Sequence, residues 1–215
     1  MSRTSVIPTP ILQRGHHRHP RNGACLMEFA ATLPGGPWAD NPVHVQPALT
    51  ALARRVNDHT SDDGRPALLP WAAWLVGTAG EHDLDGALAV RATALRHADP
   101  ALAALAWPAT ARATRRLIRL AVATVAGSLH PDEALRALLA DAVNATRSTA
   151  GLEPVVVDSA GYREWPTTQP IRVELRIPDG SESAFYFCTA LPGGWPRALA
   201  EAWSARADEL RRRTA

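Results

Sequence analysis

Apolar residues recur at intervals of three and four along most of the chain, in segments that proline or glycine separates. This spacing puts the apolar side chains on one face of a helix, as in helices that bury one side in a core. Proline is tolerated in the first turn of a helix but not in its interior, so Pro47 and Pro108 are interpreted as helix starts. The pattern predicts helices over residues 23–33, 47–57, 66–76, 83–97, 108–126 and from 131 to about 148, with a short helical turn at 100–107.

The same spacing predicts which side of each helix faces the core. Trp71 and Trp74 lie three residues apart, and an aromatic pair at this spacing is typical of a core rather than of a cofactor site. The other inward-facing residues are expected to be Leu49, Leu52, Ala53 and Val56, then Leu84, Leu88, Ala92 and Leu95, then Leu117, Ala121 and Val125, and finally Leu135, Leu138, Leu139 and Val143.

The pattern changes after residue 150. Residues 171–177 alternate between apolar and charged side chains, which is the period of a half-buried strand. A Pro-Asp-Gly-Ser turn follows, so a hairpin with residues 184–188 is predicted, and residues 154–157 are a third candidate strand. A helix over 196–213 is expected to close the chain. The fold class is therefore mainly α, with a flexible arm at 1–21, a helical domain of six or seven helices at 22–150 and a small β-β-β-α subdomain at 151–215, its sheet antiparallel.

Composition limits the function classes only broadly. A length of 215 residues suits one medium domain or one domain with a small appendix, and a net charge of +2 is too small to indicate nucleic acid by itself. All 23 basic residues are arginine. Two cysteines give no disulfide framework, which favours the cytoplasm, and no apolar run approaches the ~20 residues that cross a bilayer. No glycine-rich phosphate loop is present, so no cofactor is predicted.

The first segment of functional interest is Arg14–Trp38. Asn22 is a good N-cap for a helix beginning at about Gly23, which would put Cys25 in the first turn. A thiol there feels the positive end of the helix dipole, so a lowered pKa is expected. Glu28 lies on the same face, three residues further on. Upstream, a loop carrying three histidines can fold back over the helix start: His16, His17 and His19.

Three interpretations of this segment compete. Cys25 is a nucleophile with one of the histidines as its base and Glu28 as the group that orients that base. Alternatively, a histidine joins Cys25 or Glu28 as a metal ligand, although the spacing matches no standard metal motif. In the third interpretation Cys25 is a small buried residue and the histidines form an exposed polar loop.

The second segment is the helix predicted over 108–126. It carries four arginines at intervals of three and four, which places them on one face, and no acidic residue occurs between Asp99 and Asp132. They therefore have no acidic partner within the helix. A solvated face, acids from other helices and a bound anion all satisfy such charges, and guanidinium groups suit phosphate and carboxylate. The four residues are Arg112, Arg115, Arg116 and Arg119.

A resemblance covers roughly the first sixty residues. Gly-Ala-Cys-Leu-Met-Glu at 23–28, Trp38-x-Asp40-x-Pro42 and Asn57-Asp58 resemble a family of uncharacterised proteins from actinobacteria and their phages. The Leu-Pro-Gly-Gly turn at 33–36 departs from the family's pattern. The resemblance implies no activity.

The sequence therefore favours a soluble helical binding or regulatory module. It is expected to engage an unknown protein or an anionic ligand through the arginine face, with no membrane partner, and nucleic acid is not indicated by the net charge. The first alternative is a Cys25-dependent hydrolase or transferase with a nearby histidine base. The second is a protein that binds metal through histidine and cysteine.

Overall fold

The structure is a computed structural model of the 215-residue chain. It describes residues 12–19, 22–33, 37–152 and 154–155 in full, and the backbone of three short strands.

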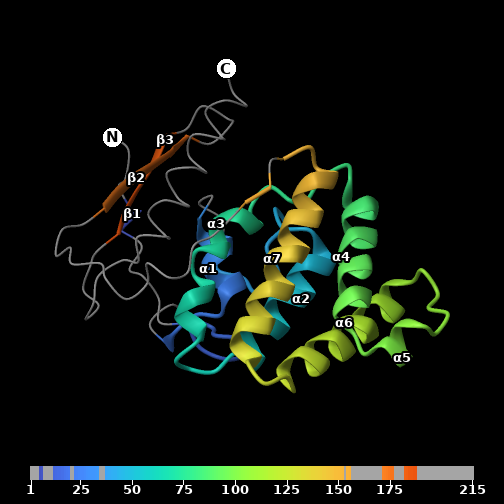
Figure 1. The fold of residues 1–215 in the computed structure, drawn as a ribbon. Helices are drawn as coiled ribbons and strands as arrows, with labels where there is room; N and C mark the ends of the chain where they lie inside the picture. The colour runs from blue at the N-terminus through green and yellow to red at the C-terminus, as the bar shows by residue number, and fades with distance from the viewer. Residues whose placement is uncertain are drawn as a thin grey trace.

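Four helices form the body of the molecule, and each of them contacts the other three. In Figure 1, α7 runs through the middle with α2 behind it, and α4 and α6 lie to one side. Helices α6 and α7 are joined by the short connection 127–130, which is typical of neighbouring helices in a bundle. These helices are α2 (Pro47–His59), α4 (Asp83–His97), α6 (Ala111–Ala126) and α7 (Pro131–Thr149).

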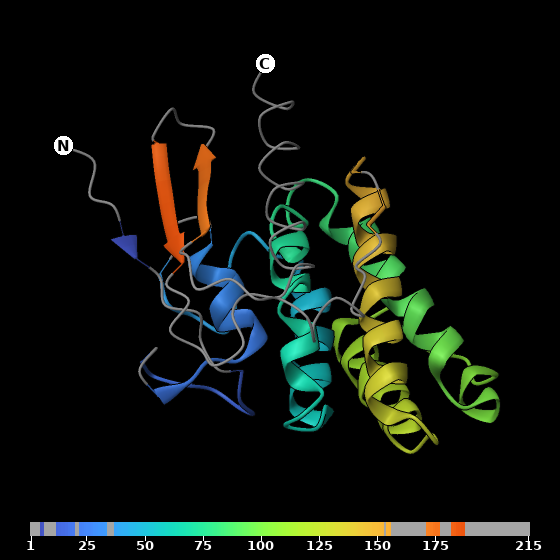
Figure 2. The same cartoon turned by 60° about the vertical axis from the view of Figure 1, so that its left-hand side comes forward.

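Two shorter helices cover the other side of this bundle. In both views α1 lies on the far side of α2 and α7 from α4 (Figures 1 and 2). Contacts join α1 to α2 and to α3, and α3 also touches α7. A one-turn helix, α5, precedes α6. The bounds are Leu26–Thr32 for α1, Trp71–Leu75 for α3, Pro100–Ala103 for α5 and Arg65–Leu68 for a 3-10 turn before α3.

The described part is mainly helical, as predicted, and most of the predicted core faces are buried. Trp71 and Trp74 are 5% and 6% exposed, so the aromatic pair belongs to the core. The predicted inward faces of α2, α6 and α7 are buried without exception. No helix within the described ranges has the length and apolarity that crossing a bilayer needs.

The predicted inward face of α4 is wrong for Leu84, Leu88 and Ala92, whereas Leu95 packs against the core. Leu84 is 74% exposed and Leu88 is 46% exposed. The buried side of α4 consists instead of small or β-branched residues, because α2, α6 and α7 all pack closely against this helix. These buried residues are Gly86, Val90, Thr93 and Ala94.

Two helix starts also differ from the prediction. Helix α1 begins at Leu26 with Cys25 as its N-cap, rather than after Asn22, so Cys25 lies before the first turn. Helix α6 begins at Ala111, because the Thr110 side chain accepts from the Ala113 amide at 3.2 Å and forms the N-cap there. The helix predicted over 66–76 is divided into the 3-10 turn and α3.

Three strands are described by their backbone. Strand β2 (Ile171–Arg176) pairs antiparallel with β3 (Glu182–Phe187), with Val173 opposite Phe185. Strand β1 (Ser5–Val6) pairs parallel with β3, so the sheet order is β1-β3-β2. Pro154 and Val155, from the candidate strand at 154–157, belong to no strand. Residues 156–157 and the helix predicted over 196–213 lie outside the described residues.

Candidate functional site

Cys25 and Glu28 together begin α1. The Cys25 Sγ accepts from the Glu28 amide at 3.4 Å, and the Glu28 Oε2 accepts from the Cys25 amide at 2.7 Å. This reciprocal arrangement is a capping box, in which two amides at the helix start find acceptors. A thiol occupies the position that serine or threonine usually fills. Both side chains are buried.

Glu28 also binds the upstream loop. Its Oε1 accepts from the His17 amide at 2.5 Å and lies 2.9 Å from the His16 Nδ1. Its Oε2 lies 3.0 Å from the His17 Nδ1. The loop therefore folds back over the start of α1, as predicted, and the two imidazoles converge on one carboxylate.

The carboxylate of Glu28 is fully buried yet favoured in its charged form. Burial by itself raises the pKa of Glu28, but hydrogen bonds from the His17 and Cys25 amides and from the His17 imidazole outweigh it. The net effect lowers the pKa below its ordinary value of 4.5. Glu28 is thus an ionised acceptor around which the loop is ordered.

The residues that carry the family resemblance meet in this same region. The Trp38 Nε1 donates to the His17 carbonyl at 2.7 Å. The Asp40 Oδ2 lies 3.8 Å from the His16 Nδ1 and 2.8 Å from the Arg54 guanidinium. Trp38 and Asp40 thus join the histidine loop to the segment before α2, and Arg54 joins that segment to α2.

Asn57 and Asp58 complete this anchoring. The Asn57 side chain accepts from the Leu26 amide at 3.2 Å and donates to the Gln13 carbonyl at 2.8 Å. The Asp58 carboxylate accepts from the Gly15 amide at 2.8 Å. Residues 12–19, which the sequence places in a flexible arm, are therefore held against α1 and α2 by hydrogen bonds. The separate parts of the motif therefore share one structural role, which is to position this loop.

The expected activation of Cys25 is contradicted. Burial, rather than the helix dipole, dominates its environment and raises the pKa of the thiol from 9.0 to about 12. The hydrogen bonds from the Glu28 and Met27 amides oppose this rise without reversing it, and the neighbouring negative charge of Glu28 acts in the same direction as burial. Cys25 is 2% exposed, so the neutral thiol serves as a cap inside the core.

The other candidate ligands of this segment are arranged differently from a metal centre. Within the described ranges, no group of three or more His, Cys, Asp or Glu side chains is placed to hold a metal ion. His19 is exposed, and its carbonyl accepts from the Asn22 amide at 3.0 Å. Glu28 binds His16 and His17 directly, which leaves their Nδ1 atoms engaged with a carboxylate.

The arginine face of α6 is exposed along its whole length. Arg112, Arg115, Arg116 and Arg119 are all exposed, while Leu117, Ile118, Ala121 and Val122 on the other side are buried. In the part of the chain that the structure describes, none of the four takes part in a salt bridge. Acids on the described helices therefore do not neutralise the positive charge that the sequence places on this helix face.

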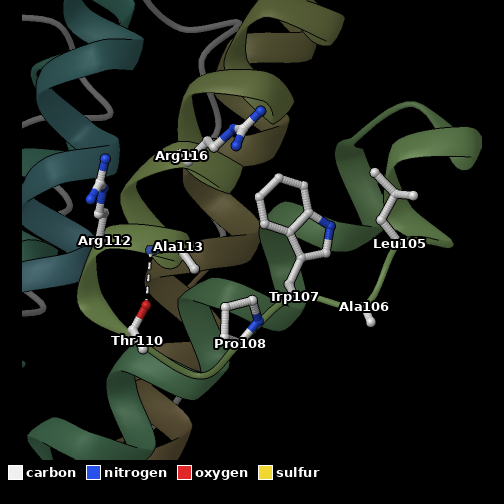
Figure 3. A pocket seen from close by; sticks show the side chains of 8 residues that line it. All are labelled: Leu105, Ala106, Trp107, Pro108, Thr110, Arg112, Ala113 and Arg116. Carbon is white, nitrogen blue, oxygen red and sulfur yellow. Dashed lines mark hydrogen bonds between the residues drawn. The ribbon is translucent and has the colours of Figure 1, made fainter.

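A pocket of about 370 Å³ lies at one edge of this face (Figure 3). The Arg116 guanidinium carbon is 5.8 Å from the centre of the Trp107 ring, a cation–π contact. In Figure 3 the indole lies between Arg116 and Leu105. Among the described residues that line the pocket, the only charged groups are the guanidinium groups of Arg112 and Arg116. The lining residues are Leu105, Ala106, Trp107, Pro108, Thr110, Arg112, Ala113 and Arg116.

The backbone of the Trp107 segment is held in place. The Arg91 guanidinium donates to the Pro108 carbonyl at 2.9 Å and to the Trp107 carbonyl, and the Trp107 Nε1 donates to the Leu102 carbonyl at 2.9 Å. The indole is therefore preorganised before anything binds.

A second pocket, of about 230 Å³, lies at the opposite edge of the arginine face. It is formed where the start of α6 meets α2 and α4, and Arg115 and Arg91 contribute its charge. The exposed residues Leu84 and Leu88, which the sequence predicted to be core, line this pocket instead.

Sequence reasoning found the four arginines but not their surroundings. Trp107 was predicted only as the end of a short helical turn, and its contact with Arg116 depends on how the turn folds back onto α6. Arg55, on α2, adds positive charge near Arg119. The pKa of Arg55 is lowered mainly by burial and, as the next cause, by the positive charge of Arg119. An arginine one helix away cannot be identified from the spacing within α6.

Comparison with known proteins adds no family to these observations: no family model, curated protein or solved structure matches the chain.

Proposed function

We propose that the protein is a helical binding module that engages an anionic partner through the arginine face of α6. The supporting observation is that four exposed arginines on one helix have no salt-bridge partner among the described residues. Like charges held this close repel one another, and an anion that binds between them removes the repulsion while gaining charge-assisted hydrogen bonds.

The rigidity of α6 favours binding. The helix is capped by Thr110 at its start and by Gly127 at its end, and its other face is packed into the core. The guanidinium groups project from a fixed scaffold, so little backbone entropy is lost when a ligand binds. The pockets on both edges provide apolar surface beside the charge.

A Cys25-dependent hydrolase or transferase has weaker support. Glu28 orients two imidazoles, as that mechanism requires, but the thiol is buried and its pKa is raised to about 12, so little thiolate exists near neutral pH. The metal-binding alternative has no group of three or more ligands among the described residues.

Three further assignments complete the proposal. The chain belongs with the actinobacterial and phage proteins that share its N-terminal motif. Residues 151–215 form a small unit around the hairpin of β2 and β3, attached to the helical domain. The module acts in the cytoplasm.

Retention on heparin tests the anion-binding proposal, because heparin is a polyanion without aromatic groups. The R115E/R116E variant is expected to elute at clearly lower salt than the unmodified protein. R18E/R136E is the matched control, since it changes the net charge equally at two positions outside the arginine face, one in the histidine loop and one on α7, and it is expected to shift elution much less. Equal shifts for the two variants would show that net charge alone drives retention, and the proposal would then be abandoned.

A further inference from the structure

We infer that the anionic partner is a single strand of nucleic acid, with one base in the Trp107 pocket and phosphates along the arginine face. This inference rests on the proposed function and names the ligand of the same site. It is carried by the juxtaposition of an aromatic pocket with a row of exposed guanidinium groups that form no salt bridge among the described residues.

The pocket has the chemistry of a base-binding site. Trp107 supplies an aromatic surface, and Leu105 and Pro108 add apolar walls around it. Leu105 is 56% exposed, so its apolar surface is open to a ligand that enters the pocket. Stacking of a base on an aromatic side chain is sequence-tolerant, because every base has a flat face.

The charges beside the pocket match the phosphates that flank a base. Arg112 and Arg116 both line the pocket and are one helical turn apart, about 6 Å along the axis. Each guanidinium can bind a phosphate through two hydrogen bonds. A base in the pocket therefore has a phosphate-binding group close by.

The positive surface extends beyond the pocket. Arg119 lies one turn further along α6, and its charge acts on Arg55 of α2. A free nucleotide would reach only the arginines that line the pocket, whereas a strand brings further phosphates to this extension. The local charge exceeds what the net charge of +2 suggests.

Two other anions fit these features less well. A duplex keeps its bases stacked inside, so none is free to enter the pocket. An acidic segment of a protein supplies carboxylates for the arginines but no flat aromatic group that accompanies each charge. Both are included as competing ligands in the experiment.

Fluorescence anisotropy of a labelled thymidine oligomer of about 12 nucleotides provides the measurement, since sites on small single-strand-binding domains span about 4–16 nucleotides. Binding is expected, with log K falling against log salt at a slope of roughly −2 to −3 if three or four phosphates are contacted. R112E/R116E is expected to abolish detectable binding, and R18E/R136E to reduce it far less.

The pocket is tested by W107A and L105E. Loss of stacking worth about 1–3 kcal/mol is expected to weaken binding by roughly 5- to 150-fold in W107A. L105E puts a carboxylate into the pocket at an exposed position and should weaken binding at least as strongly. Circular dichroism checks the fold, and L105E decides the question if W107A does not fold. Unchanged affinity in L105E overturns the inference.

The competitors separate the inference from the proposed function. The inference fails if adenosine monophosphate, a duplex of equal length or polyglutamate binds as tightly as the oligomer. It also fails, with the proposed function intact, if the oligomer does not bind while heparin retention still depends on Arg115 and Arg116. If neither heparin nor the oligomer depends on the arginines, both proposals fail.

Discussion

Cys25 and Glu28 each accept a hydrogen bond from the other's backbone amide, so a thiol and a carboxylate together begin α1. The carboxylate also receives the His17 amide and two imidazoles, which joins the helix cap to the loop before it. The helix start, the loop and the burial of Cys25 therefore depend on one another.

The cap gives a prediction for substitutions of Cys25. C25A removes the acceptor for the Glu28 amide and is expected to lower the free energy of unfolding by about 0.5–2 kcal/mol, the usual effect of losing an N-cap. C25S keeps an acceptor and should be closer to the unmodified protein. Urea unfolding measures both. Equal losses in the two variants would mean that packing of the sulfur, not the cap, is what matters.

The buried thiol predicts how stability changes at alkaline pH. Burial raises the pKa of Cys25 from 9.0 to about 12, so the folded protein keeps a proton that the unfolded chain releases. This contribution to stability is fully present below pH 9 and is lost as pH rises toward 12. Iodoacetamide labelling of a C188S variant, which leaves Cys25 as the single cysteine, should be slow at pH 8. Rapid labelling there would contradict the buried thiol.

The lowered pKa of Glu28 leads us to expect that the protein loses stability at acidic pH. The pKa of Glu28 is lowered in the folded state, because hydrogen bonds outweigh the effect of burial, so its stabilisation is present above pH 4.5 and is lost as pH falls through the folded-state pKa. E28Q puts an amide NH₂ where an oxygen accepted hydrogen bonds, and is expected to cost about 2–4 kcal/mol. Unfolding measured from pH 3 to 7 should show a weaker acid dependence in E28Q, and an unchanged profile would refute the role assigned to the carboxylate.

We expect repulsion between Arg119 and Arg55 to lower the stability of the folded protein. The charge of Arg119 is a secondary cause, after burial, of the lowered pKa of Arg55, so the two residues repel each other. R119Q is expected to raise the free energy of unfolding by up to about 0.5 kcal/mol and to weaken heparin retention. The gain in stability should disappear in high salt, which screens exposed charges. R18Q is the control, and a gain of the same size in R18Q would remove the explanation.

At Gly86 we expect the usual preference for alanine over glycine inside a helix to be reversed. Alanine in place of glycine inside a helix normally stabilises it by about 1 kcal/mol. At Gly86 a Cβ atom would lie 2.9 Å from the Gln46 Cγ and 3.3 Å from the Thr146 Cγ2. Gln46 cannot move easily, because its side chain hydrogen-bonds to Leu49 and to Asp83. G86A is therefore expected to lower the melting temperature, whereas G127A, with ordinary contacts of 3.5 Å, should not.

The buried face of a helix was predicted correctly where one side of the helix is clearly apolar and the other is polar. In α6 and α7 one side is apolar and the other polar, so Leu117 and Leu139 were correctly expected in the core. Helix α4 packs against three helices, and close approach selects small residues such as Gly86 and Ala94. Leu84 and Leu88 therefore lie at the surface while Leu95 packs against the core, so leucine spacing alone does not identify the buried side of α4.

The candidate site was predictable only in its residues. The spacing of Cys25 and Glu28 indicated one face and the loop was expected to fold back, but cysteine is rarely an N-cap and its burial reverses the expected pKa shift. The position of Trp107 beside Arg116 depends on the path of the chain between α5 and α6, which local patterns do not specify.

Asn57 connects two segments with the two ends of a single amide, receiving the Leu26 amide on its oxygen and giving a hydrogen to the Gln13 carbonyl. Deamidation, the slow chemical ageing of asparagine, would set an oxygen against that carbonyl oxygen and turn attraction into repulsion. The long-term stability of the fold around the N-terminal loop thus depends on protecting the Asn57 side-chain amide from hydrolysis. Asn57 is completely buried, which keeps water away from it.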